Sequence, residues 1–493
     1  MTRATAWTPA LSKEIRALLP VWGATAAALA AAFQGDRLGI GLLAYVAGST
    51  ALGAQSIGQE YAYRTLPMLL SQPADRRRTY LLKFSVTAVM LLTLAPLAAI
   101  VLADTWRPNA SPFSVVLLPV LCGLFLAPLF TMICRSSLAG MILSTSVPAV
   151  TWLTTLAIAW FCFGIDADQA TSILLGRLAL GLTVVCPLLA VLGWRRFTGL
   201  EATEGAAPAF HFPGWLSRAD GERRHSPLKA LAVKELYLQQ LTFGLVALYV
   251  VVWAALLMGQ RYIPSWSSFP LGAVMLLYCT GLAIMIGALA SAEERQHRTL
   301  DWQLLQPTPA WQQWLVKVGV SFGLALMFGA GLPILLNEAT PLEGFAIGMP
   351  VDFTLMIVLL AAGSIYVSSL SGSGVRAMVL TLPIGMAVVL FAQMVRGALR
   401  WATLQVAGPL MADVVIGSIG PSSGDASVVV VFAARGLALA LVPVLLWFGF
   451  VNHTSTDGTA RRIFRQAAVI ALLITAGILL VGAVLVFHEL RSR

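Results

Sequence analysis

The sequence predicts an all-α polytopic membrane protein, with two parallel six-helix repeats related by a pseudo-twofold axis along the membrane normal and a thirteenth C-terminal span. The 493 residues are 58% hydrophobic and only 11% charged, with a mean hydropathy of +0.83. Soluble domains carry about 25% charged residues. Apolar runs of about 20 residues, the length of a membrane-spanning helix, recur along the chain. A polar segment between two of these runs occurs twice.

The repeated polar segment covers residues 60–83 and 294–317, in which nine of 24 positions are identical without a gap. Because the identical residues are mainly polar or turn-forming, shared hydrophobicity alone does not explain them. The matches include Glu60 and Glu294, Arg64 and Arg298, Thr65 and Thr299, Leu66 and Leu300, Pro73 and Pro307, and Lys83 and Lys317. The sequence therefore indicates a duplication, with the two segments at equivalent places in its halves.

Each segment leaves one apolar run and enters another, as a loop at a membrane surface does. Glu60 and Arg64 stand four residues apart with the acid first, the order that stabilises a helix by about 0.2–0.5 kcal/mol. Thr65 is suited to cap a following short helix, Leu66 starts its apolar face, and Pro73 ends it. The second copy has the same spacing, so each loop is expected to hold a short amphipathic helix.

Each copy has the same order of features: an apolar span, Glu, Arg-Thr-Leu, a short helix, a Pro turn and a Lys. This order resembles the first cytoplasmic loop of the type-2 class of ATP-binding-cassette (ABC) exporter permeases. The likeness covers about residues 8–451. It implies that each loop carries a coupling helix resting on a separate, homodimeric ABC ATPase at the cytoplasmic face. The basic turn Arg76-Arg77-Arg78 is typical of the family, whereas the second copy has Ala310-Trp311-Gln312.

The resemblance thus implies that the chain is the permease subunit of an exporter, and that ATP hydrolysis by the partner ATPase drives the transport. ATP and Mg are expected on that ATPase, because no phosphate-binding loop Gly-x-x-x-x-Gly-Lys-Ser/Thr occurs here. The chain itself is expected to be no enzyme and to bind no cofactor. Coupling roles are implied for Glu60, Arg64, Thr65, Leu66, Pro73, Arg76, Lys83, Glu294, Arg298, Thr299, Leu300, Pro307 and Lys317.

The chain divides into a first permease half at 1–194, a cytoplasmic linker at 195–226, a second half at 227–451, and a basic segment with an extra span at 452–493. An amphipathic surface helix is expected to open each half. In the first, Leu11, Ile15, Leu18 and Leu19 mark an apolar face opposite Lys13, Glu14 and Arg16; the second begins at Ser226-Pro227 and carries Lys234-Glu235. The predicted spans are 17–33, 38–58, 80–103, 112–133, 139–163, 172–193, 237–258, 269–291, 315–336, 351–371, 376–395, 427–450 and 466–487.

The charge distribution over the loops predicts the orientation. On this topology 23 of the 32 Lys and Arg, and 12 of the 22 acids, lie on the side shared by the N-terminus and the duplicated loops. By the positive-inside rule that side is cytoplasmic. The net charge of +10 is therefore attributed to membrane topology rather than to nucleic acid, and we expect an integral protein of a bacterial cytoplasmic membrane.

Few residues suggest chemistry within the spans. The five cysteines are read as packing residues, and the five scattered histidines form no metal-binding motif. Arg177 and Arg435, toward the outer ends of the sixth spans, either reach the headgroups or line an outer vestibule that attracts an anionic substrate. Glu60 and Glu294 are either acids of a surface helix or part of a coupling structure.

Two other functions remain open at this stage. A membrane-embedded lipid-modifying transferase is expected to show clustered His, Asp or Glu at one membrane face, and the sequence shows no such cluster. An ion-coupled secondary carrier is expected to have acids in mid-membrane, which are nearly absent. Between Pro383 and Arg435 the second half has about 23 residues more than the first has between Pro148 and Arg177, which predicts an external gate or lid.

Overall fold

The computed structural model of the chain is all-helical over the residues that it describes. These are 7–34, 38–62, 65, 68, 75–102, 112–163, 167–200, 227–262, 269–296, 308–339, 350–385, 387–392, 394–395, 424–455 and 460–492.

The first predicted half contains six helical stretches, of which the fourth is interrupted by the π-helical segment η3. Their bounds are α1 (Trp7–Gln34), α2 (Leu38–Ala62), α4 (Arg76–Leu102), α5 (Pro112–Leu121), η3 (Cys122–Leu126), α6 (Ala127–Cys134), α7 (Ser137–Phe163) and α8 (Ala167–Thr198).

The second half repeats this order with a separate first helix and with its π-helical segment, η4, in the third stretch. Its elements are α10 (Pro227–Leu238), α11 (Gln240–Tyr262), α12 (Phe269–Gln296), α14 (Ala310–Leu324), η4 (Ala325–Gly331), α15 (Leu332–Ala339), α16 (Pro350–Leu370), a helix at Gly374–Ala392, and α18 (Gly424–His453). The chain continues into α19 (Ala460–Ser492).

Eleven helices within the described residues are long and apolar enough to cross a membrane. Each of the thirteen predicted spans overlaps a helix of the structure. Helix α2 carries the polar residues Ser49, Thr50, Gln55 and Ser56, all of which are buried. The protein is thus an integral, helical membrane protein, while the count of thirteen spans stays a prediction.

The start of the first half differs from the expectation in two ways. No break separates the surface helix from the first span, because α1 runs without interruption from Trp7 to Gln34. The predicted polar and apolar faces are also partly exchanged: Glu14 is buried, whereas Leu11 and Leu19 are exposed. The physical reason is an ionic partner for Glu14 on another helix, described below.

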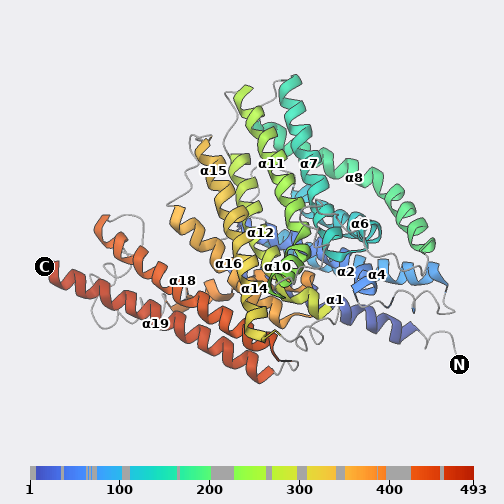
Figure 1. Ribbon diagram of the computed structural model, residues 1–493. Coiled ribbons are helices and arrows are strands. Elements are labelled where there is room, and N and C mark those ends of the chain that lie inside the picture. Colours follow the sequence, from blue (N-terminus) through green and yellow to red (C-terminus); the bar gives the residue numbers. More distant parts are fainter. Residues whose placement is uncertain are drawn as a thin grey trace.

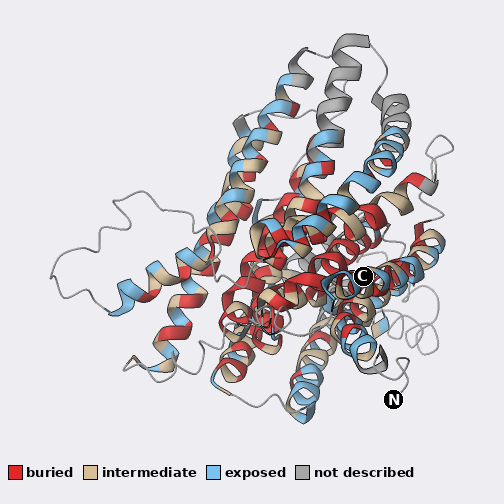
Figure 2. Cartoon of the chain, turned by 90° about the vertical axis from the view of Figure 1, so that its right-hand side faces the viewer, coloured by how far each residue is buried: buried red, intermediate tan, exposed pale blue. Residues whose placement is uncertain are grey.

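The centre of the molecule is formed by the second and fourth stretches of each half, where glycines allow close approach. A Cβ added at Gly53 in α2 would lie 1.7 Å from the Gly123 carbonyl oxygen in η3. At Gly287 in α12, 234 residues later, it would lie 2.5 Å from the Ser364 Cβ in α16. Figure 2 shows buried residues concentrated at this centre, with exposed ones on the outer helices.

The two halves contact each other through their first and fifth stretches. Helix α7 of the first half packs against α11 of the second. In the reverse direction, the Arg376 guanidinium in the Gly374–Ala392 helix donates to the Ala17 carbonyl in α1 at 3.2 Å. One hydrophobic core contains residues from both halves.

Helix α19 has no counterpart in the first half and packs along α18, as Figure 1 shows at the C-terminal end. Its buried Gln466 amide accepts hydrogen bonds from the Tyr366 hydroxyl and the Asn452 side chain, both at 3.1 Å, and donates to Asn452 at 3.0 Å. Because buried polar groups are costly unless satisfied, these bonds fix the place of α19 against α16 and α18.

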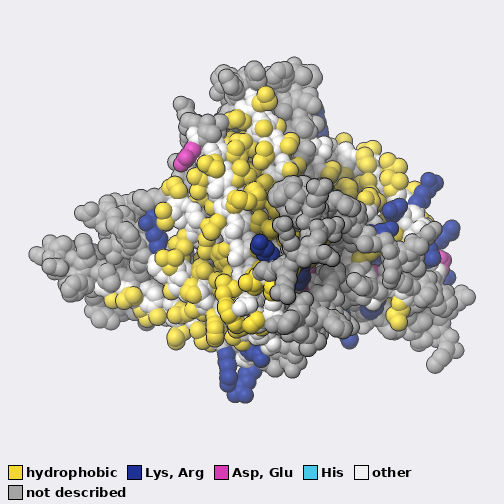
Figure 3. Space-filling view, in the orientation of Figure 1, with side chains coloured by type: hydrophobic (Ala, Val, Ile, Leu, Met, Phe, Trp, Pro, Cys, Tyr) yellow, Lys and Arg dark blue, Asp and Glu magenta, His cyan; other side chains and the backbone are white. Residues whose placement is uncertain are grey.

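The outer surface is dominated by hydrophobic side chains, as Figure 3 shows over a broad central area, while Lys and Arg gather mainly toward the lower and right-hand margins of that view. Val184, Leu188 and Leu480 are among the large apolar side chains that are more than half exposed. A large exposed apolar surface of this kind marks contact with a membrane or with other proteins, and the long apolar helices favour the membrane.

Candidate functional site: two buried lysine–glutamate networks

In the first half, one buried lysine joins three helices next to the duplicated loop. Lys83 in α4 lies 2.8 Å from Glu14 of α1 and 3.0 Å from Glu60 of α2, and it also donates to the Ser56 carbonyl at 3.1 Å. Lys13 completes this network, which we call the first Lys–Glu network, by contacting Glu60 at 3.3 Å. Both ends of the loop between α2 and α4 are therefore tied to each other and to α1.

The second half contains the same arrangement. Lys317 in α14 lies 3.0 Å from Glu235 of α10 and 3.0 Å from Glu294 of α12, and it also donates to the Ala290 carbonyl. Lys234 of α10 bonds to Glu294, as Lys13 does to Glu60. We call these four charged residues the second Lys–Glu network.

The charged groups of both networks are removed from solvent, except for one lysine in each. The Lys83 and Lys317 side chains are 2% and 0% exposed, and the four glutamates are 6% exposed or less. Burying an ion costs several kcal/mol, which is recovered only by close partners and further hydrogen bonds. The carbonyls of Ser56 and Ala290 supply such bonds, so each lysine depends on the helix end beside it.

The charge balance of the second network makes Glu235 a special member. Burial raises the pKa of the Glu235 carboxyl above its ordinary value; Lys317 opposes this effect, and the nearby Glu294 reinforces it. Of the carboxyls in the two networks, Glu235 lies in α10, outside the membrane-spanning helices.

The networks bring together some of the residues that the sequence singled out. Glu60 and Lys83, and likewise Glu294 and Lys317, are ion pairs across the loop ends rather than separate features. The Thr65 hydroxyl donates back to the Glu60 carboxylate. The expected helix in each loop lies outside the described residues, together with Arg64, Leu66, Pro73, Arg298, Thr299, Leu300 and Pro307.

Sequence reasoning missed Glu14 and Glu235 as members of these sites. The signal was present, because a Lys-Glu pair occurs in the helix that opens each half, but the polar side of an amphipathic pattern was assigned to water. The exposed Lys13 and Lys234 belong to the same two pairs. Each half has an acid on its opening helix and a lysine at the start of its third span. This repetition is the pattern that could have predicted the ion pairs.

The remaining predicted residues have structural contacts of other kinds. The Arg76 guanidinium donates to the Thr198 and Leu200 carbonyls, at 2.8 and 3.0 Å, and so fastens the start of α4 to the end of α8. Arg435 forms an ion pair with Asp352 of α16 at 2.7 Å, and Arg177 is exposed on α8. The outer vestibule suggested for Arg177 and Arg435 stays a prediction.

The chain matches no protein-family model, no curated protein and no solved structure.

Proposed function

We propose that this chain is the permease subunit of an ABC transporter, and that its two duplicated loops receive the movement of a separate ATPase dimer. The observation that carries this proposal is the pair of equivalent Lys–Glu networks at the ends of these loops. The networks give the same mechanical connection twice, as two identical ATPase subunits require. Export rather than import rests on the resemblance of the loop sequences to exporter permeases.

A parallel repeat accounts for the paired features. Glu60, Ser56 and Lys83 each have a counterpart 234 residues later, at Glu294, Ala290 and Lys317, with the same contacts. Helix α7 contacts α11, and the Gly374–Ala392 helix contacts α1. In both cases the fifth stretch of one half meets the first stretch of the other, as expected for a two-fold arrangement. An even number of spans per half keeps both loops on one side of the membrane.

The networks explain how movement of a loop reaches the membrane helices. Lys83 holds the end of α2, the start of α4 and the opening part of α1 together, so the three helix segments move as one unit. The second network does the same for α12, α14 and α10. Displacement of both units by ATP-driven closure of the partner is the proposed basis of alternating access.

Association with the ATPase tests this proposal. The chain is purified from membranes, and bound proteins are identified by mass spectrometry; a polypeptide with the sequence Gly-x-x-x-x-Gly-Lys-Ser/Thr is expected. Because burial of a side chain of this size contributes roughly 1.5–3 kcal/mol, Leu66→Asp and Leu300→Asp should each reduce recovery of the ATPase at least tenfold. Val351→Asp is the control, because it makes the same kind of change on an exposed residue at the start of α16, away from the duplicated loops. Unchanged recovery and ATP-driven activity in both loop variants would refute the coupling role.

The orientation is tested by thiol labelling in a variant without native cysteines. Arg78→Cys and Gln312→Cys stand at equivalent positions of the two loops, and Asp75 is left in place because its carboxylate caps α4 by accepting from the Arg77 amide at 3.0 Å. Both introduced thiols should be protected from an impermeant reagent in intact cells and react after permeabilisation. Ser422→Cys should react in intact cells. Reaction of the first two from outside contradicts the proposed topology.

An ion-coupled carrier is the second candidate, because the structure buries more acids than the sequence suggested. Glu235 combines burial with a raised pKa, as a proton-handling carboxyl does. Reconstituted vesicles distinguish the two functions: an ABC transporter requires the ATPase and ATP and is insensitive to a protonophore, whereas a proton-coupled carrier works without ATP and stops when the gradient collapses.

A further inference from the structure

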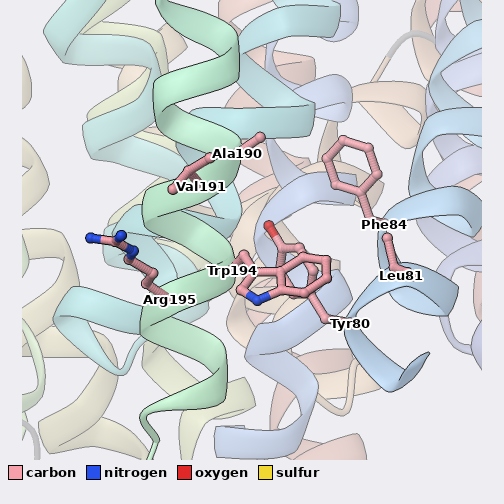
Figure 4. A pocket seen from close by; sticks show the side chains of 7 residues that line it. All are labelled: Tyr80, Leu81, Phe84, Ala190, Val191, Trp194 and Arg195. Carbon is pink, nitrogen blue, oxygen red and sulfur yellow. The ribbon is translucent and has the colours of Figure 1, made fainter. Parts of the chain in front are cut away.

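A groove between α4 and α8 is lined by apolar and aromatic side chains and has an open volume of about 370 Å³. This lies within the roughly 300–1,000 Å³ of ordinary ligand clefts. Tyr80, Leu81 and Phe84 contribute from α4, and Ala190, Val191, Trp194 and Arg195 from α8 (Figure 4). Leu81 and Val191 are half exposed, so the groove opens on the outer surface of the protein.

The groove has one apolar and one cationic end. Helix α4 starts at Arg76 where α8 ends at Thr198, and the Arg76 bonds to the Thr198 and Leu200 carbonyls hold these ends together. Toward these ends lie Arg77, Arg78, Arg195 and Arg196, whereas Phe84 and Ala190 lie farther into the apolar parts of the helices. In Figure 4 the Arg195 side chain extends from α8 away from the aromatic rings.

The floor of the groove is built from packed aromatic rings. Tyr80 packs against Trp194 and Phe197, with ring centroids 6.2 and 5.3 Å apart, and the Arg77 guanidinium lies 5.9 Å from the Trp194 ring centroid. Gly193 leaves room for the Tyr80 hydroxyl, which would lie 2.7 Å from an added Cβ. Such packing preforms the groove and places a cation at its aromatic edge.

The second half repeats the aromatic cluster with other residues at the positions of the four arginines. Trp314 takes the place of Tyr80 and packs against Phe450 and His453, with ring centroids 6.4 and 5.2 Å apart, and Gly449 lies beneath its ring. Trp314 and Leu446 are larger than their counterparts Tyr80 and Ala190. Because Gly449 contacts Trp314 as Gly193 contacts Tyr80, Val451 takes the place of Arg195, and Ala310, Trp311 and Gln312 stand at the positions of Arg76, Arg77 and Arg78. The two halves therefore share the packing of the cluster, while the arginines beside the groove belong to the first half.

We propose that this groove binds one anionic phospholipid of the surrounding bilayer, with an acyl chain along Phe84, Leu81 and Val191 and the phosphate headgroup at Arg77 and Arg195. The shape and charge of the groove match this ligand, since an apolar channel open to the hydrocarbon leads to cations at the headgroup level. Basic pockets between membrane helices bind acidic lipid headgroups by this chemistry. This inference does not depend on the ATPase.

The inference also gives the basic turn a second explanation. Arg76-Arg77-Arg78 lies beside the groove of the first half, and the second copy has Ala310-Trp311-Gln312 at these positions. Binding of lipid to the first half alone would make the two otherwise equivalent halves unequal.

Native mass spectrometry of the purified chain tests the proposal, with phosphatidylglycerol and phosphatidylcholine of identical acyl chains added in equal amounts. One phosphatidylglycerol should be retained in preference to phosphatidylcholine. Since each basic residue near a lipid surface contributes about 1 kcal/mol, the Arg77→Gln/Arg195→Gln variant should bind it roughly 10- to 30-fold more weakly. Val191→Trp, which fills the groove from an exposed position, should abolish its retention. Leu315→Trp, at the exposed position equivalent to Leu81, is the control and should behave as the wild type.

Equal retention of both lipids by the wild-type chain overturns the proposal, as does unchanged phosphatidylglycerol retention by Val191→Trp. Gel filtration of every variant establishes that it remains folded, and the three substituted groove residues lie on the surface. Displacement of the lipid by a co-purifying protein seated on Leu81 and Val191 would likewise assign the groove to a protein partner and contradict the lipid assignment. ATPase recovery is measured in parallel and should not change with Val191→Trp.

Discussion

Replacing Lys317 by methionine should destabilise the protein by about 3–5 kcal/mol, the cost of leaving a buried charge without its partner. Glu235 and Glu294 would both lose the ammonium group that now lies 3.0 Å from each of them. Lys83→Met should have a similar effect through Glu14 and Glu60. The loss is measured as the drop in thermal stability of the detergent-solubilised protein, followed by fluorescence-detected size exclusion.

Two controls separate loss of the ion pairs from loss of side-chain volume. Lys13→Met removes the exposed lysine of the first network, whose side chain is 58% exposed, and should cost no more than about 1 kcal/mol. The triple variant Glu14→Leu/Glu60→Leu/Lys83→Met replaces the buried charges together and should recover most of the stability that Lys83→Met loses. If Lys83→Met and Lys317→Met are as stable as Lys13→Met, the networks do not hold the helices together.

Introducing valine at Gly53 should destabilise the protein by about 3 kcal/mol or more, at the upper end of the range for overpacked cores. A Cβ at this position would lie 1.7 Å from the Gly123 carbonyl oxygen, and this atom belongs to the backbone and cannot rotate away. Helices α2 and η3 must separate, which also moves Glu60 at the end of α2. We therefore expect reduced ATPase association as well as reduced thermal stability.

The matched control is Gly281→Val in α12, where nothing lies within 4 Å of an added Cβ. This change should alter stability by less than about 1 kcal/mol, because surface or uncrowded substitutions rarely do more. Gly287→Val, at the position equivalent to Gly53, should be nearly as damaging because its Cβ would lie 2.5 Å from the Ser364 Cβ. Equal stability of the Gly53 and Gly281 variants would show that close packing of α2 does not support the fold.

The sequence by itself determined the class of the protein and the places of its helices. Low charge and long apolar runs leave no other solution than membrane helices, because unpaired backbone groups are not tolerated in lipid. The repeated positions of Glu60, Lys83, Glu294 and Lys317 also identified the loop ends, since spacing along the chain survives duplication. The boundary between the surface helix and the first span was predicted wrongly, because α1 continues through it although Pro20 lies inside the helix.

The tertiary structure alone decided which charges are paired. An amphipathic pattern shows that a helix has a polar side, but it cannot show whether water or another helix meets that side. Glu14 was therefore assigned to the solvent face, although Lys83, 69 residues away, buries it. The same limit hid the groove between Tyr80 and Trp194, because it arises only where the start of α4 meets the end of α8. Both features depend on contacts between distant segments, and the free energy of such contacts is not encoded in local periodicity.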